Sequence, residues 1–206
     1  MTATSTIIRK KTAPSGISVV TAERFAEGMP SCAAWMKAIE KNQENFQRHY
    51  DEWQADPADI DAVKALVQKH GVKALVIGED WCPDVWRGLP VMARMGELTG
   101  MEVRFFLRDQ NKDIMAEFLK DGEFESVPTI VLYDRDHRYL GHWIERADRA
   151  NAEMVALREI TAGVERDTPA WTEARAKYTA KTWEMAEGWR DAQLTEIRAL
   201  LDEALG

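Results

Sequence analysis

Cysteine is scarce in this sequence. Its 206 residues include two cysteines, Cys32 and Cys82, which lie fifty positions apart. Small secreted domains that depend on disulfides carry a denser and more regular set of cysteines, so a secreted disulfide framework is excluded. Two isolated thiols fit a reducing compartment instead, and we expect a cytoplasmic protein.

Positive charge and long apolar runs are also in short supply. The chain has 27 Lys and Arg residues against 35 Asp and Glu residues, which gives a formal net charge of −8. Without a basic excess the protein has little to offer a phosphate backbone, so we expect no nucleic acid partner. No apolar run approaches the ~20 residues that a membrane-spanning helix needs, so we expect no membrane partner either.

The first twenty residues lack the apolar segment of a secretory signal. They contain Arg9, Lys10 and Lys11 together with several hydroxyl residues, and no acidic residue precedes Glu23. Two interpretations stay open, namely a short organelle-targeting peptide and a frayed N-terminus. The frayed terminus is the simpler interpretation, and we expect residues 1–20 to form a flexible lead-in.

Motifs for metal ions and nucleotide cofactors are missing as well. The four histidines, His49, His70, His137 and His142, show no metal-ligand spacing with one another or with the cysteines. The sequence has neither a Gly-x-Gly-x-x-Gly pattern nor a P-loop, so nucleotide binding has no support. We therefore expect no metal site and no bound cofactor.

What the sequence does contain is a series of helix and strand patterns. Trp35, Ile39, Phe46 and Trp53 follow Ser31 at the spacings of one helical face, which predicts one helix with Cys32 in its first turn. Further helices are predicted over residues 56–70, 84–99, 111–121, 146–162 and from 168 onward, and strands over residues 72–78, 102–108, 127–133 and 138–143. The large aromatic residues of the final helix are expected to pack it against the core.

The connections between the predicted strands define a mixed sheet. A helix joins the first two strands, which implies a parallel crossover, and a short turn joins the last two, which implies an antiparallel hairpin. We therefore predict an α/β fold with a central mixed sheet of about four strands flanked by helices. The predicted organisation is a lead-in over 1–20, an N-terminal helical extension over 21–56, a core over 57–145 and a C-terminal helical extension over 146–206.

The turn at Trp81-Cys82 is the candidate functional site. An apolar strand runs into Glu79-Asp80, and Cys82 then stands where the next helix begins. The free N–H groups and the positive dipole end of a helix favour a thiolate, whereas nearby carboxylates such as Asp84 oppose it. On balance we expect a modestly depressed pKa for Cys82.

Three features of this region resemble the thioredoxin superfamily. They are Trp81-Cys82-Pro83-Asp84-Val85, Pro90 eight residues after the cysteine, and Val127-Pro128-Thr129 before a strand. The sequence is similar to bacterial thioredoxin-like proteins with a Glu-Asp-Trp-Cys-x-Asp signature and added helices at both ends. The resemblance implies a thioredoxin-like fold with a cis-proline facing Cys82 as the nucleophile. It also implies substrate contacts by Trp81, Pro83, Asp84, Val127, Pro128 and Thr129.

The departures from that family pattern bear on function. Val85 stands where thioredoxins have the resolving cysteine, Val76 where they have a buried aspartate, and Phe105 near the position of an accompanying lysine. An internal Cys82–Val85 disulfide is impossible, so dithiol reduction is excluded. A mixed disulfide at Cys82 would need an external thiol such as glutathione, or Cys32 if its Cα lies within about 7 Å.

Two functional hypotheses follow from these residues. The first is a monothiol thiol-disulfide oxidoreductase that acts on protein or small-molecule disulfides, with glutathione or another low-molecular-weight thiol as co-substrate. The second is a redox-inactive binding or interaction module that keeps the thioredoxin-like fold. The tryptophans of the C-terminal helix, Trp171, Trp183 and Trp189, could also pair that helix with a second copy of the chain.

Overall fold

The computed structural model describes residues 18–206, and the predicted flexible lead-in lies almost entirely outside the described residues. Its centre is a four-stranded sheet of β1 (Lys73–Gly78), β2 (Glu102–Leu107), β3 (Thr129–Tyr133) and β4 (Tyr139–Ile144). The strand order is β2-β1-β3-β4. β1 and β2 are parallel, and β3 runs antiparallel to both β1 and β4. The predicted mixed α/β sheet is therefore confirmed.

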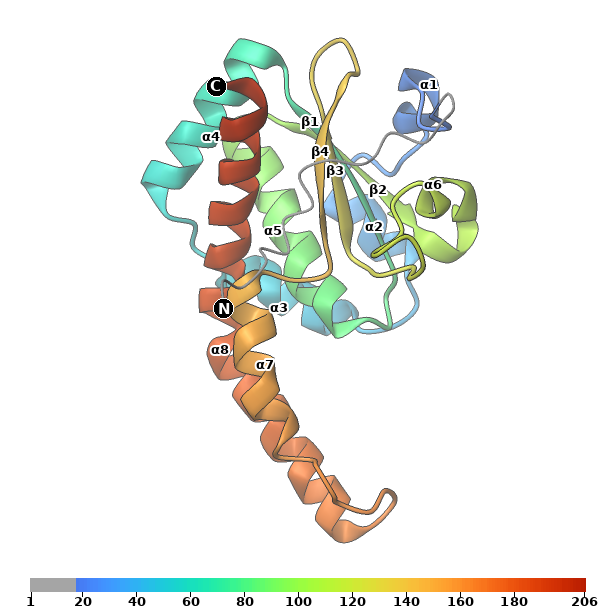
Figure 1. Ribbon diagram of the computed structural model, residues 1–206, viewed down its shortest axis with the longest axis vertical. Helices are drawn as coiled ribbons and strands as arrows, with labels where there is room; N and C mark the ends of the chain where they lie inside the picture. Colours follow the sequence, from blue (N-terminus) through green and yellow to red (C-terminus); the bar gives the residue numbers. More distant parts are fainter. Residues whose placement is uncertain (1–17) are drawn as a thin grey trace.

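Helices cover both faces of this sheet (Figure 1). On one side lie α4 (Pro57–His70), α5 (Pro83–Thr99) and the C-terminal half of α8 (Pro169–Leu205). On the other side lie α1 (Ala22–Ala26) and α6 (Lys112–Ala116), and a short 3-10 helix (Arg108–Gln110) leads into α6. All residues of β1 after Lys73 are buried, as expected for a strand enclosed between two helical layers.

Local signals place the ends of the long helices. Asp56 accepts hydrogen bonds from the N–H groups of Ala58 and Asp59 and so caps α4, and Gly71 ends that helix with a φ of 63°. Thr168 caps α8 by accepting from the Trp171 N–H, and Pro169 follows at the first helical position. These helix boundaries agree with the prediction, because the capping residues and the prolines stand next to the helix ends in the sequence.

The single helix predicted from Ser31 to Trp53 is wrong. The chain forms α2 (Cys32–Ala38) and α3 (Gln43–Glu52), with Asn42 in the left-handed conformation between them at a φ of 59°. Asp80 provides the reason, because its Oδ2 accepts hydrogen bonds from the backbone N–H groups of Glu40 and Lys41. Asn42 Nδ2 also donates to the Asp80 carbonyl. The turn before Cys82 therefore stabilises the break between α2 and α3.

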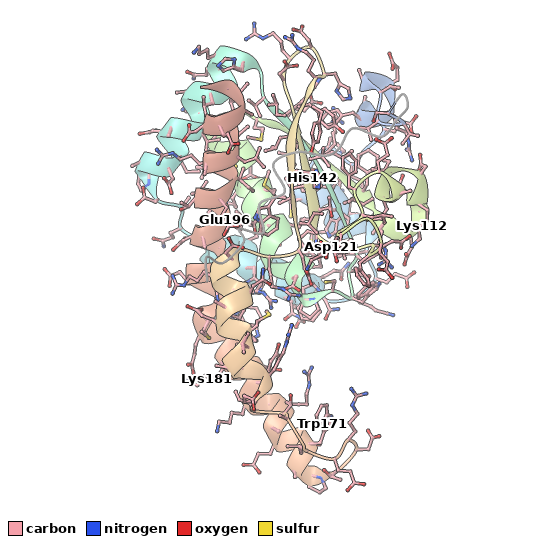
Figure 2. The ribbon with its side chains drawn as sticks, in the orientation of Figure 1. Lys112, Asp121, His142, Trp171, Lys181 and Glu196 are labelled. Atoms are coloured by element: carbon pink, nitrogen blue, oxygen red, sulfur yellow. The ribbon has the colours of Figure 1, made fainter. Side chains whose placement is uncertain are left out.

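The C-terminal helices form an antiparallel hairpin that extends away from the sheet. α7 (Asp148–Arg158) packs along the N-terminal half of α8, and Trp171 lies near the far end of this hairpin (Figure 2). Ile197 and Leu201 join the main core, whereas Trp189 packs with Met154 and Leu157 in a separate small cluster. The expectation that all the tail aromatics pack against the core is therefore wrong for Trp171 and Trp189.

Within residues 18–206 no helix, α8 included, is long and apolar enough to cross a membrane.

Candidate functional site

The turn that follows β1 places Cys82 immediately before the first residue of α5. Cys82 is the N-cap residue, with extended backbone angles, and Pro83 occupies the first helical position. The Cys82 carbonyl accepts a hydrogen bond from the Val85 N–H at 3.0 Å. Gly78 is needed before this turn, because a Cβ there would lie 2.7 Å from Val85 Cγ1.

The thiol of Cys82 faces the loop that leads into β3. Its Sγ lies 3.5 Å from the Val127 carbonyl oxygen, to which the S–H donates. The Val127–Pro128 peptide bond is cis. Thr129 is fully buried and its hydroxyl donates to the Ser126 carbonyl at 2.8 Å, which ties down the loop. Of the residues predicted for the site, Cys82 and Val127 are therefore in direct contact. The Cys82 side chain is only 9% exposed, so little of it faces solvent.

Asp84 binds two arginines beside the thiol. Arg146 places its Nη2 2.5 Å and its Nε 3.1 Å from Asp84 Oδ2, and Arg87 donates to Oδ1 of the same carboxylate. All three side chains are largely buried. Neither arginine was predicted from the sequence. Arg87 lies three residues after Asp84 on one helix, a spacing that could have indicated the pair, whereas Arg146 is brought in from beyond β4 by the fold alone.

The expectation of a depressed pKa for Cys82 is wrong. Burial raises the pKa of the Cys82 thiol, and the Asp84 carboxylate raises it further. The backbone N–H groups of Val85 and Asp84 and the guanidinium of Arg87 act in the opposite direction, but more weakly. The helix start does favour the thiolate, as the sequence indicated, but the desolvation that comes with tertiary packing outweighs it.

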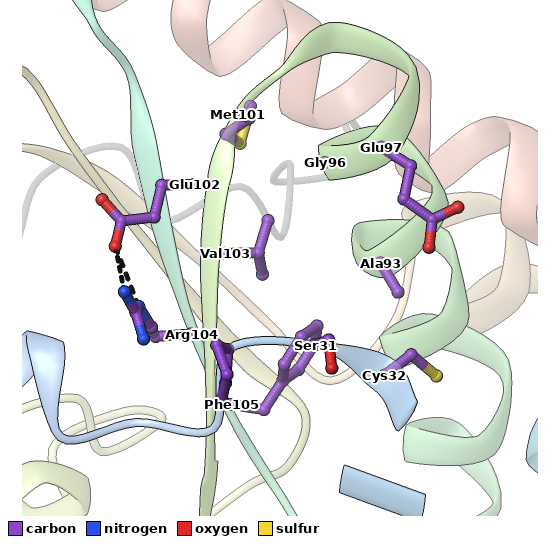
Figure 3. A pocket seen from close by; sticks show the side chains of 11 residues that line it. Ser31, Cys32, Ala93, Gly96, Glu97, Met101, Glu102, Val103, Arg104 and Phe105 are labelled. Atoms are coloured by element: carbon purple, nitrogen blue, oxygen red, sulfur yellow. Dashed lines mark hydrogen bonds and ion pairs between the residues drawn. The ribbon is translucent and has the colours of Figure 1, made fainter. Parts of the chain in front are cut away.

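Cys32 does not reach Cys82. It lines a cavity of about 240 Å³ between α2, β2 and the C-terminal half of α5, and Ala93 on α5 lies near it in the same cavity (Figure 3). Ala93 lies eleven residues after Cys82, and the helical rise places it roughly 16 Å further along the axis. Burial raises the pKa of Cys32 to about 11. An internal Cys32–Cys82 disulfide, left open by the sequence, is therefore excluded in this fold.

Trp81 is the exposed member of the site. Its side chain is 47% exposed, and the guanidinium of Arg108 lies over its ring at 5.1 Å. The ring therefore presents an apolar surface to solvent next to the buried thiol. Pro83 is also exposed.

The positions that depart from the family pattern lie in the apolar interior. Val76 and Val85 are fully buried, and Phe105 is almost so. Val76 and Phe105 are direct partners in the parallel β1–β2 pairing. Within residues 18–206 no group of three or more His, Cys, Asp or Glu side chains is placed to hold a metal ion.

A four-stranded mixed sheet, a cysteine at the start of α5 and a cis-proline loop against its thiol define a protein of the thioredoxin fold. The comparison with family models agrees. Residues 29–163, more than half of the chain, match a family described as Thioredoxin, and the chain belongs to that family.

Solved structures share the fold at low sequence identity. A protein of unknown function from Pseudomonas aeruginosa is 19% identical, with a TM-score of 0.64, over 92% of this chain and 99% of that one. An HIV epitope-scaffold is 18% identical, with a TM-score of 0.61, over 91% of this chain and 99% of the scaffold. No curated protein matches the sequence.

Proposed function

We propose that this protein is a monothiol thiol-disulfide oxidoreductase with Cys82 as its nucleophile. The observation that carries the proposal is the contact between Cys82 Sγ and the Val127 carbonyl beside the cis-proline. This contact sets the thiol against a backbone segment that can align a substrate chain. The exposed ring of Trp81 offers an apolar surface beside it. The family resemblance also assigns Pro83, Asp84, Pro128 and Thr129 to the proposed substrate site, although the side chains of Asp84 and Thr129 are buried in this structure.

The proposed reaction is thiol-disulfide exchange in two steps. Cys82 loses its proton to solvent, and the thiolate attacks one sulfur of a substrate disulfide; a Cys82–substrate disulfide forms and the other substrate sulfur leaves as a thiolate that takes up a proton. An external thiolate such as glutathione then attacks the substrate sulfur of this mixed disulfide. A disulfide between substrate and glutathione forms, and Cys82 leaves as its thiolate. A reducing cytoplasm would supply that thiol.

The alternative function, a redox-inactive binding module, is favoured by a different observation. Cys82 is only 9% exposed, and burial raises the pKa of its thiol, so little thiolate exists at neutral pH. Under this alternative the exposed Trp81 would still contact a partner, but Cys82 would be an ordinary buried side chain.

The two functions differ in whether Cys82 forms a mixed disulfide. The protein is incubated with oxidised glutathione between pH 7 and 9.5 in a Cys32→Ala background, and the adduct at Cys82 is followed by intact-mass spectrometry. The proposal expects an adduct that forms faster as pH rises and that reduced glutathione removes. The Cys82→Ser variant is the control. A native protein that forms no adduct at pH 9.5 would support the binding module instead.

A further inference from the structure

A second cavity lies beside the thiol site, on the side of the helical hairpin. Its volume is about 430 Å³, and it is enclosed by α3, the first turns of α5 and the facing parts of α7 and α8. We call it the hairpin pocket, and the residues that matter here are Arg87, Arg146, Arg158, Arg175, Tyr178 and Trp183. Small-molecule sites typically have ~300–1,000 Å³, so the pocket is of that size. Cys82 does not line it.

The hairpin pocket carries an excess of positive charge. Four arginines line it against a single carboxylate, that of Asp84, although the whole chain has a net charge of −8. Arg87 and Arg146 are both bound to Asp84. Arg158 and Arg175 form no ion pair with any other residue between 18 and 206, and Arg175 lies over the Tyr178 ring at 5.3 Å. Two guanidinium groups are thus left to bind an anion.

Positive charge also lies behind the wall of the hairpin pocket. Arg190 is only 4% exposed, its Nη1 lies 2.7 Å from His49 Nδ1, and its Nε has no hydrogen-bond partner in the described part of the chain. Burial and the neighbouring arginines lower the pKa of His49 to about 2. The ring is therefore neutral at physiological pH and adds no charge to the wall. Arg190 forms no ion pair in the described part of the chain, although the carboxylates of Glu52, Glu187 and Asp191 act on its charge electrostatically. Arg158 and Arg175 are therefore the guanidinium groups that remain available to an anion.

The wall formed by Trp183 is aromatic and held in place. Its ring stacks on His49 with centroids 4.1 Å apart and an interplanar angle of 11°, and the Arg48 guanidinium lies over it at 4.1 Å. Tyr178, five residues before Trp183 on α8, lines the same pocket. Aromatic walls bind flat or apolar groups, while guanidinium groups bind carboxylates and phosphates in a paired, planar geometry.

We propose that the hairpin pocket binds a small organic anion, whose carboxylate or phosphate is held by Arg158 and Arg175 and whose remaining part lies against Tyr178 and Trp183. The guanidinium groups supply the charge recognition, and the aromatic wall selects organic anions over inorganic ones. Binding at this site does not require the chemistry of Cys82, so it can be tested separately from the oxidoreductase proposal.

Binding is measured by isothermal titration calorimetry on the full chain with oxidised glutathione for carboxylates, adenosine monophosphate for phosphate, and adenosine as the uncharged control. At least one anionic probe is expected to bind with a dissociation constant below 1 mM, and adenosine is expected to bind at least tenfold more weakly than adenosine monophosphate if the phosphate probe is the ligand. Which probe binds decides between a carboxylate and a phosphate ligand. With oxidised glutathione the titrations are run in the Cys82→Ser background, in which this probe cannot form a mixed disulfide.

The double substitution Arg158→Gln and Arg175→Gln should weaken that binding at least tenfold. Both side chains are exposed on helices, so the variant is expected to fold, which circular dichroism checks. Arg166→Gln is the matched control, because Arg166 is an exposed arginine near the hairpin tip that does not line the pocket. The proposal is overturned if neither anionic probe binds to the wild-type protein, or if the double variant binds as tightly as the wild type and Arg166→Gln.

Discussion

Replacing Asp84 by Asn should lower the pKa of Cys82. The Asp84 carboxylate is the second largest cause, after burial, that raises the pKa of this thiol. The substitution removes a negative charge beside the thiolate and leaves the guanidinium groups of Arg87 and Arg146 less neutralised, so both effects favour the thiolate. A like charge within ~4–6 Å typically moves a pKa by about 1–3 units. We take the lower value, about one unit, because both groups keep some contact with solvent.

One pKa unit has a defined kinetic consequence. At a pH below the pKa of Cys82, lowering this pKa by one unit raises the fraction of Cys82 present as thiolate about tenfold. A thiolate of lower pKa is also intrinsically less nucleophilic, with a Brønsted slope of about 0.4–0.5. The two effects together predict a reaction rate at pH 7 that is roughly three- to fourfold higher. The substitution also weakens a largely buried ion pair, so we expect a loss of up to about 3–5 kcal/mol in the free energy of unfolding.

The assay is the alkylation rate of Cys82 by iodoacetamide between pH 6 and 10.5 in a Cys32→Ala background. The midpoint of the rate profile should lie about one unit lower in the Asp84→Asn variant than in its parent. Glu145→Gln is the matched control, because Glu145 also binds Arg146 but is not among the groups that raise the Cys82 pKa. A midpoint that stays in place or rises in a folded Asp84→Asn variant would refute the electrostatic reasoning.

Two further predictions concern stability. Burial raises the pKa of Cys32 to about 11, so the native state favours the neutral thiol; this stabilisation is fully present below the unfolded-state pKa and is lost as pH rises through the folded one. The wild type should therefore lose about 2–3 kcal/mol more than Cys32→Ala between pH 8 and 11 in urea unfolding, and parallel losses in both proteins would contradict this. Gly141→Ala should destabilise by about 1–3 kcal/mol, because a Cβ there lies 2.9 Å from Leu200 Cδ2 where β4 meets α8. Gly188→Ala, whose Cβ meets only the end of the Arg149 side chain, should be neutral or stabilising by up to ~1 kcal/mol, and equal thermal shifts in the two variants would argue against this packing.

The sheet and the long helices could be predicted because their signals are local. The continuous apolar run of β1 indicates a strand buried on both faces, and Asp56-Pro57 and Thr168-Pro169 mark helix starts within a few residues. The break between α2 and α3 could not be predicted in this way. The carboxylate that binds the two free N–H groups belongs to Asp80, about forty residues further along the chain.

The features of the candidate site also separate into those that local sequence predicts and those that tertiary packing decides. The sequence by itself determined that a lone cysteine begins a helix, that valine replaces the resolving cysteine, and that a proline precedes β3, since each of these is a matter of residue identity and local pattern. Only the tertiary structure decided that Cys32 lies far from Cys82, that Arg146 binds Asp84, and that burial raises the thiol pKa. Distances between remote segments and the loss of solvent around a group arise from packing, and a helix start that favours a thiolate is outweighed when the fold removes its water.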